Sequence, residues 1–221
     1  MVAKLISLCL PKGDALEPLA RFLETVQFPI RGYHAKNRTY RPELEGLPVR
    51  AKIMAEKDVA LQVAVGNYDL GCCGLDWVRE HAVKYRASHL HVFRLLGLAR
   101  KGLFVCAGTE SVIESVEKTG NIPGFVTIVS EYPNLAENFA IRNRLGRFKI
   151  FSAWGSVEGY PPEHADLVLL AASDVSDLPA MGLRPLCLEL ASELCLVVNR
   201  NSLMTRDLSP VLGYFADRGG I

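Results

Sequence analysis

Lysine and glycine residues suited to binding phosphate follow the first apolar run of the chain. Pro11-Lys12-Gly13 comes directly after LISLCL and just before a helical pattern that begins at Asp14. Backbone N–H groups at a helix start, together with the Lys12 ammonium group, suit a phosphate or a pyrophosphate. Asp14 opposes an anion there and equally suits a helix N-cap. An anion site and an ordinary helix start are therefore both open interpretations.

Two glycines lie three residues apart at the end of a later apolar run, YDLGCC. Gly71 and Gly74 lack a Cβ and precede Asp76, so a flat ligand such as a nucleotide base could approach the backbone closely. Tight turns explain such glycines more often than ligands do. A nucleotide site and a structural turn both fit the pattern.

Hydroxyl and carboxylate groups follow two apolar runs in the second half of the chain. GSVE comes after FKIFSA, and its Ser156 and Glu158 could bond ribose hydroxyls, although surface turns look the same. Residues 165–183, ADLVLLAASDVSDLPAMGL, predict a buried strand, a loop and a short helix, an arrangement that can hold phosphate. The turn has no glycine, and Asp174 and Asp177 would repel an anion.

Other candidate sites favour a structural interpretation. His89 and His91 would share one face of a strand, but zinc needs a third ligand that the spacing does not indicate. The six cysteines lie mostly in apolar runs, which is typical of reduced core residues. Residues 31–57 carry seven basic and three acidic residues, which fits an anion site or a solvated surface equally well. We expect no metal site made by the protein's own side chains.

Composition limits the class of protein. The chain has 221 residues, a formal net charge of +1 and 49% hydrophobic residues, which disfavours a disordered chain and a basic nucleic-acid-binding protein. No apolar run approaches the ~18 residues of a membrane span, and the N-terminus lacks a signal-peptide cleavage pattern. We expect a cytoplasmic protein with no nucleic-acid or membrane partner.

Apolar runs alternate with helical patterns along the chain, which predicts an α/β fold. Several of the runs lack polar alternation, as strands covered on both faces do. The expected strands are residues 4–10, 49–55, 68–73, 103–108, 125–130, 148–153, 166–172 and 193–199, and the expected helices are 14–27, 59–65, 111–118 and 134–145.

Periodicity is interrupted near residues 88–100 and 175–185. We expect two α/β lobes, one made of residues 1–90 plus 180–221 and the other of residues 91–179, with a ligand cleft between them.

The order of these motifs resembles that of one enzyme family. LPKG, DLGCCGLD, EYPNL, GSVE and the strand-loop-GL segment, from Leu10 to about Leu183, are similar to ATP phosphoribosyltransferase, the first enzyme of histidine biosynthesis. The resemblance implies a two-lobed fold like the type II periplasmic binding proteins. It also implies that adenine N1 of ATP attacks ribose C1 of phosphoribosyl pyrophosphate as Mg-bound pyrophosphate leaves, with Mg²⁺ brought by the substrate.

The resemblance also assigns roles to residues and implies partners. The chain is expected to be the short form, to form a homodimer and to assemble with a regulatory subunit similar to histidyl-tRNA synthetase. The implied catalytic residues are Lys12, Arg38 and Lys57, the nucleotide-binding residues are Gly13, Gly71, Gly74 and Asp76, and the phosphoribosyl-binding residues are Ser156, Glu158, Ser173, Asp174, Val175, Ser176 and Asp177.

The chain departs from the family pattern at several of these positions. Asp14 replaces a usual arginine, Ala55 replaces a basic residue that faces the pyrophosphate, and Ala60 replaces a proline. An acid on the strand followed by [ST]-G-x-T-L falls here on Leu170 and residues 173–178. Two alternatives therefore stand beside the enzyme: a non-catalytic or divergent member that binds another small ligand, and an enzyme for a substrate without a 5-phosphate.

Overall fold

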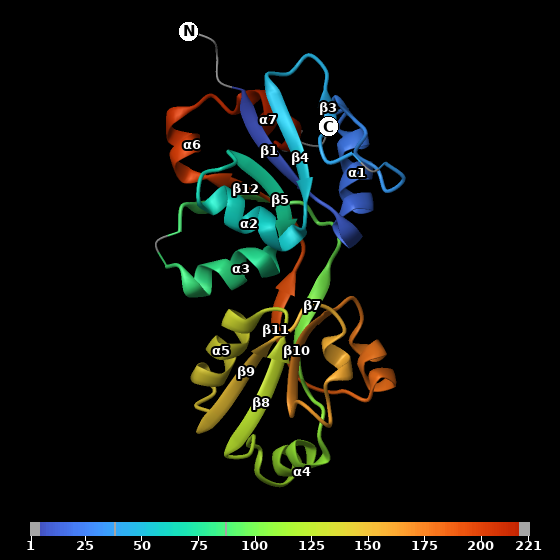
Figure 1. Cartoon of the computed structure of the whole chain (residues 1–221), viewed down its shortest axis with the longest axis vertical. Helices are drawn as coiled ribbons and strands as arrows, with labels where there is room; N and C mark the ends of the chain where they lie inside the picture. Colours follow the sequence, from blue (N-terminus) through green and yellow to red (C-terminus); the bar gives the residue numbers. More distant parts are fainter. Residues whose placement is uncertain (1–4, 38, 87, 217–221) are drawn as a thin grey trace. The chain divides into compact units, whose positions relative to one another are not determined.

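Two α/β units make up the chain in a computed structural model that describes residues 5–37, 39–86 and 88–216 (Figure 1). Unit 1 contains the described residues of Met1–Val78, Ala87–Ala99 and Glu193–Ile221, and unit 2 those of Arg79–Arg86 and Arg100–Ser192. Each unit has its own mixed five-stranded sheet. The α/β class and the presence of two lobes are thus confirmed.

The sheet of unit 1 has the strand order β4-β1-β5-β12-β6. Strands β1, β4 and β5 are parallel, and β12 runs antiparallel to both β5 and β6. Every residue of β1, β5 and β12 is buried, because helices cover both faces. The bounds are β1 Ile6–Pro11, β4 Val49–Met54, β5 Leu70–Gly74, β6 Leu90–Leu95 and β12 Leu194–Asn199, with a two-stranded ribbon of β2 Ile30–Arg31 and β3 Glu43–Leu44.

Alternating side chains divide the core of unit 1 into two layers. Leu8 and Leu10 of β1 pack with helices α1 (Leu16–Thr25) and α7 (Ser209–Phe215). Cys9, which points to the opposite face, packs with Val59 and Val63 of helix α2 (Glu56–Ala64).

Unit 2 has the strand order β11-β7-β10-β8-β9. Strands β8, β9 and β10 are parallel, and β7 runs antiparallel to both β10 and β11. Helix α5 packs on β8 and β9, and helix α4 on β7. The bounds are β7 Lys101–Ala107, β8 Phe125–Ser130, β9 Arg147–Ser152, β10 Leu167–Ala172, β11 Arg184–Ser192, α4 Glu110–Thr119 and α5 Pro133–Arg142.

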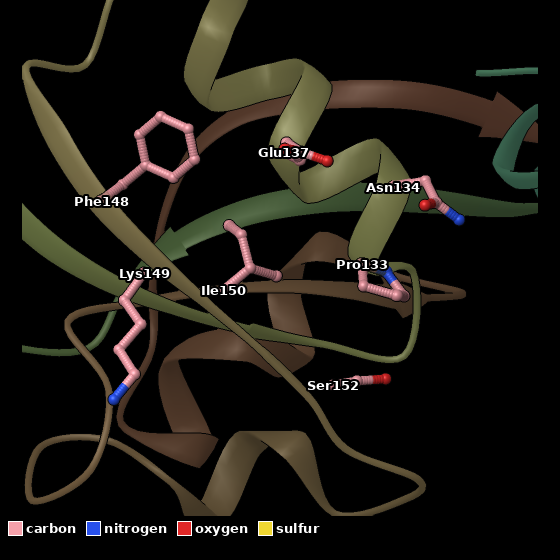
Figure 2. Close-up of a pocket in the computed structure, with 7 residues that line it drawn as sticks. All are labelled: Pro133, Asn134, Glu137, Phe148, Lys149, Ile150 and Ser152. Atoms are coloured by element: carbon pink, nitrogen blue, oxygen red, sulfur yellow. The ribbon is translucent and has the colours of Figure 1, made fainter. Parts of the chain in front are cut away.

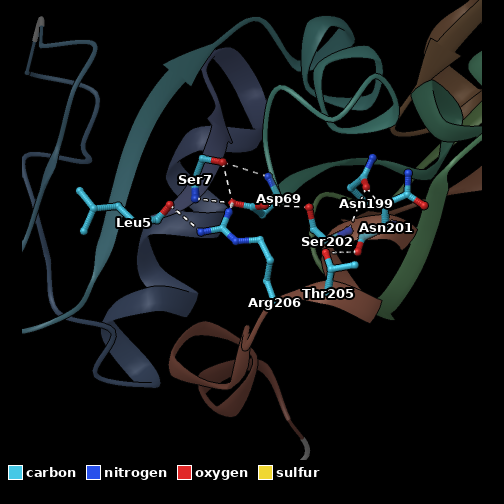
Figure 3. A network of polar contacts seen from close by, with 8 residues as sticks. All are labelled: Leu5, Ser7, Asp69, Asn199, Asn201, Ser202, Thr205 and Arg206. Carbon is cyan, nitrogen blue, oxygen red and sulfur yellow. Dashed lines mark hydrogen bonds and ion pairs between the residues drawn. The ribbon is translucent and has the colours of Figure 1, made fainter. Parts of the chain in front are cut away.

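A buried polar network fastens the C-terminal segment to unit 1 (Figure 3). The Asp69 carboxylate, just before β5, accepts hydrogen bonds from Ser7, from Ser202 of helix α6 (Arg200–Thr205) and from Arg206. Arg206 also donates to the Leu5 carbonyl oxygen at 2.9 Å. The segment after β12 is therefore anchored at the amino ends of β1 and β5.

All eight expected strands are present, and two further strands complete the sheets. β6 lies in the sheet of unit 1 and β11 in that of unit 2, so the units change at 99/100 and 192/193, whereas the expected lobes change at 90 and 180. Both are edge strands that pair antiparallel with one neighbour. Polar residues interrupt their apolar runs in the sequence: His91 and Arg94 in β6, and Arg184 and Glu189 in β11. Helix α3 (Leu75–Lys84), which was not expected, spans the boundary at 78/79. None of the described helices has the length and apolar character needed to cross a membrane.

Candidate functional site

The carboxyl ends of three parallel strands bring two of the expected site residues of unit 1, Lys12 and Gly74, to one edge of the sheet. Pro11 pairs with Met54, and Cys9 pairs with both Lys52 and Gly71. Continuing this register places Lys12, Ala55 and Gly74 at one level: Lys12 and Ala55 directly follow β1 and β4, and Gly74 is the last residue of β5. This edge of a parallel sheet is the usual place for ligands in α/β proteins.

Lys12 and Gly13 form the start of a short 3₁₀ helix, η1 (Gly13–Ala15). The Lys12 N–H donates to the Met54 carbonyl oxygen at 2.9 Å, while the residue itself is exposed. Gly13 has a φ of +80°, a conformation that favours glycine, and a Cβ there would meet nothing within 4 Å. Tyr33, which the sequence did not single out, donates from its buried hydroxyl to the Pro11 carbonyl oxygen at 2.7 Å. The backbone before Lys12 is thus held, while its side chain faces solvent.

Two carboxylates, those of Glu56 and Asp76, lie beside Gly74. Oε1 of Glu56 accepts a hydrogen bond from the Gly74 N–H at 2.6 Å, and Asp76 is fully buried in the first turn of α3. A Cβ on Gly74 would lie 2.0 Å from Oδ1 of Asp76 and 2.6 Å from Oε1 of Glu56. The absence of a side chain at Gly74 therefore makes room for two carboxylates of the protein.

Gly71 meets helix α2. A Cβ there would lie 2.6 Å from both Sγ of Cys9 and Cγ1 of Val59. The structure thus gives Gly71 a packing reason of its own. Lys57 is half-buried in the first turn of α2, and Arg38 lies outside the described residues.

Three loops gather the expected phosphoribosyl-binding residues at one edge of unit 2. They follow β8, β9 and β10, which are parallel, with Ser130 opposite both Ser152 and Leu169. Oε1 of Glu131 accepts a hydrogen bond from the Gly155 N–H at 2.6 Å and so joins the first loop to the second. In that second loop, the exposed Ser156 has a φ of +51° and is followed by η2 (Val157–Gly159), which contains the half-buried Glu158.

The third loop contains a charged side chain, the carboxylate of Asp174. Residues 173–177 are all exposed, and Oδ1 of Asp174 accepts a hydrogen bond from the Ser176 N–H at 2.8 Å at the start of the 3₁₀ helix η3 (Val175–Met181). The backbone and hydroxyl groups of Ser176 lower the pKa of Asp174 by hydrogen bonding. A charged carboxylate of the loop itself thus accepts the hydrogen bond of the Ser176 N–H group.

A depression of about 460 Å³ lies elsewhere on unit 2, between α5 and β9 (Figure 2). Figure 2 shows Lys149 directed away from Pro133 and Asn134. None of the residues that the sequence singled out as binding residues lines it, although Pro133, Asn134 and Ser152 of its lining border the first and second loops. Its lining residues are Pro133, Asn134, Glu137, Phe148, Lys149, Ile150 and Ser152.

Sequence analysis missed four polar residues that organise the two edges: Tyr33, Glu56, Glu80 and Glu131. Glu80 accepts hydrogen bonds at the start of α5, and the others bond the loops described above. Only Glu131 had a local signal, because it belongs to EYPNL. The others contact residues at least 18 positions away, and nothing in the local sequence specifies such partners.

Comparison with known proteins identifies the family. The profile of HisG, ATP phosphoribosyltransferase, matches residues 55–213. An ATP phosphoribosyltransferase of Prosthecochloris aestuarii is 30% identical over 202 residues, 90% of this chain and 65% of the relative. One of Pelodictyon phaeoclathratiforme is 25% identical over 91% of this chain and 66% of its own length. The chain thus spans slightly less than two thirds of these curated relatives.

Solved structures agree with this fold. The ATP phosphoribosyl transferase (HisG:HisZ) complex from Thermotoga maritima superposes with a TM-score of 0.75 at 20% identity, covering 96% of this chain and 95% of that one. The alkanesulfonate-binding protein SsuA from Xanthomonas axonopodis pv. citri has a TM-score of 0.56 at 15% identity, covering 96% and 71%. Both likenesses show the fold alone, whereas the profile match covers most of the sequence. This chain belongs to the ATP phosphoribosyltransferase family.

Proposed function

We propose that the chain transfers a phosphoribosyl group from phosphoribosyl pyrophosphate to N1 of ATP, the first step of histidine biosynthesis. The observation that carries this proposal is the family match over residues 55–213, which includes DLGCCGLD, EYPNL and GSVE. In the proposed reaction, a bond forms between adenine N1 and ribose C1 while the bond from C1 to the pyrophosphate oxygen breaks. No covalent intermediate with the protein is required.

The proposed roles follow the two sheet edges. Exposed Lys12 binds a phosphate group with the N–H groups around Gly13, and Lys57 and Arg38 add positive charge. Ser156 and Glu158 bind ribose hydroxyls, and residues 173–177 face the 5-phosphate. Gly71, Gly74 and Asp76 are proposed for the nucleotide, where they act by shaping the backbone around β5. Positioning and charge stabilisation of the leaving pyrophosphate supply the rate enhancement.

The proposal includes partners and a location. Magnesium enters bound to the pyrophosphate of the substrate. A homodimer of this chain and a regulatory subunit similar to histidyl-tRNA synthetase complete the proposed assembly in the cytoplasm. The Thermotoga maritima structure is that of a HisG:HisZ complex, which supports the search for such a subunit.

One observation favours a second candidate function, the binding of another small ligand without transfer. Asp174 bonds the Ser176 N–H, and Asp177 adds a second exposed carboxylate to the same loop. Both charges repel a 5-phosphate. A ligand without that phosphate would avoid the repulsion.

The deciding experiment measures phosphoribosyl-ATP formation directly. Purified full chain is mixed with ATP, phosphoribosyl pyrophosphate and Mg²⁺, with and without a candidate regulatory subunit, and ultraviolet absorbance of the product is followed. The proposal expects product in at least one of the two mixtures and none when Lys12→Ala replaces the natural chain. Calorimetric binding of ATP without product in either mixture would favour the second candidate.

A further inference from the structure

The first turn of α5 is held by a carboxylate from another helix. Oε1 of Glu80, on α3, accepts hydrogen bonds from the Asn134 N–H at 2.9 Å and from its side-chain amide at 2.6 Å. Oε2 accepts a bond from the Leu135 N–H at 2.8 Å. These N–H groups belong to the first turn, where a helix has no internal acceptors for them, and Tyr132, the residue before the helix, caps none of them with its side chain.

This carboxylate is well buried, since Glu80 is only 7% exposed. Burial raises the pKa of Glu80, although the hydrogen bonds from Asn134 and Leu135 oppose that rise. An acid so placed is costly unless its bonds are satisfied, and both of its oxygens are. Its position in α3 therefore serves the start of α5.

The same stretch of chain reaches the GSVE loop. Immediately before α5, the Tyr132 N–H bonds Oγ of Ser130, which itself donates to the Leu169 carbonyl oxygen at 2.7 Å. Between these two residues, Oε1 of Glu131 accepts a hydrogen bond from the Gly155 N–H at 2.6 Å. Glu131 is thus fixed on one side by Ser130 and on the other by the helix start that Glu80 holds.

We propose that Glu80 is a positioning residue for the phosphoribosyl-binding loop: by fixing the first turn of α5 it fixes the Glu131 carboxylate, which in turn holds Gly155 and the adjoining Ser156. The role in binding rests on the proposed function, whereas the structural chain from Glu80 to Gly155 does not. The far end of α5 has a separate anchor, because Arg142 bonds Glu189 of β11 at 2.7 Å. Loss of Glu80 therefore loosens the first turn without detaching the helix.

The experiment compares Glu80→Gln and Glu80→Asp in the full chain. Glutamine keeps the size but brings an amide donor to an N–H group, and aspartate keeps the charge but withdraws it by one methylene. Asp207→Asn is the matched control, because Asp207 accepts a hydrogen bond from the Ser209 N–H at the start of a different helix, α7. Two readouts are taken: amide hydrogen exchange of a peptide spanning residues 153–158, and the KM values for both substrates.

We expect the amide hydrogens of the 153–158 peptide to exchange roughly tenfold faster in both Glu80 variants than in the natural chain. In the Asp207→Asn variant their exchange rate should be unchanged. In a Glu131→Ala background, where the link is already absent, Glu80→Gln should add little. If the natural chain turns over, KM for phosphoribosyl pyrophosphate should rise severalfold and KM for ATP should not. Unchanged exchange at 153–158 in both Glu80 variants overturns the positioning role. Absence of turnover in the natural chain contradicts the proposed function instead, and exchange still decides the role of Glu80.

Discussion

The buried carboxylate of Asp69 accepts two hydrogen bonds from Ser7, at 2.8 Å from the backbone N–H and 2.7 Å from the hydroxyl. Ser202 and Arg206 donate to the same carboxylate (Figure 3). Burial raises the pKa of Asp69, but these donors together outweigh burial and hold the pKa below its ordinary value. The network thus couples the stability of unit 1 to the ionisation of one group.

Replacing Asp69 by asparagine should destabilise the protein by roughly 3 kcal/mol at neutral pH, because the Arg206 charge loses its buried partner. The folded pKa is below the unfolded value of about 3.9, so the stabilisation is complete above that value and disappears as the pH falls through the folded pKa. The difference in unfolding free energy between the natural and variant chains, measured in urea, should therefore shrink below about pH 4. Glu114→Gln, which alters an exposed ion pair, should cost under about 1 kcal/mol. A gap that stays constant down to pH 2 would contradict this account.

The fold was largely predictable because strand signals are local. LFVCAG and FVTIVS are apolar runs of suitable length, and each became a buried central strand. Strand β11 was missed because Arg184, Pro185 and Glu189 interrupt its apolar residues. Its place depends on pairing with β7, which is a property of the whole sheet.

The candidate site was predictable in outline but not in chemistry. Motif order placed Lys12 and Ser156 at the ends of the correct strands, because parallel strands end at one edge. The reasons for individual residues came from distant contacts. Gly71 is small because α2 crosses it, and Glu80 is acidic because α5 begins beside it.

A methyl group added at Gly71 should destabilise the chain by about 1–3 kcal/mol, because its Cβ would overlap Cys9 and Val59 inside the core. Gly213→Ala is the matched control. Gly213 lies exposed in α7 with no atom within 4 Å of an added Cβ, so this change should stabilise by about 0.5–1 kcal/mol. Denaturant unfolding monitored by circular dichroism measures both. Equal stability of the two variants would refute the packing reason for Gly71.

Removal of the Tyr33 hydroxyl tests whether its hydrogen bond to Pro11 positions the neighbouring Lys12. Tyr33→Phe deletes the buried hydrogen bond to the Pro11 carbonyl oxygen and should cost about 1 kcal/mol in unfolding free energy. Because Pro11 precedes Lys12, we expect ATP affinity in calorimetric titration to fall severalfold as well. Tyr40→Phe, at a side chain 60% exposed, should change neither quantity. Loss of stability with unchanged ATP affinity would separate Tyr33 from the nucleotide site.

The loop at residues 173–177 gives the sharpest test of substrate choice. The triple change Asp174→Thr, Val175→Gly and Asp177→Thr removes two negative charges and relieves the backbone restriction at Val175. It also replaces the charged acceptor of the Ser176 N–H, which Asp174 now bonds at 2.8 Å, with a neutral hydroxyl. We expect affinity for phosphoribosyl pyrophosphate to rise by roughly tenfold or more at low salt, with a smaller gain at high salt because ions screen the exposed carboxylates.

The control for this loop changes net charge by the same amount at a different place. Glu110→Gln with Glu114→Gln removes two exposed carboxylates from α4 and leaves residues 173–177 intact. Calorimetric titration should show no more than a twofold gain for this control, because long-range repulsion between exposed carboxylates and an anionic substrate is weak at physiological ionic strength. If the control gained as much affinity for phosphoribosyl pyrophosphate as the triple variant, the increase would be due to net charge and not to the loop. No gain in the triple variant, in a chain that still binds ATP, would mean that the loop does not meet the 5-phosphate. A natural chain that already binds phosphoribosyl pyrophosphate tightly would show that Asp174 and Asp177 are no obstacle.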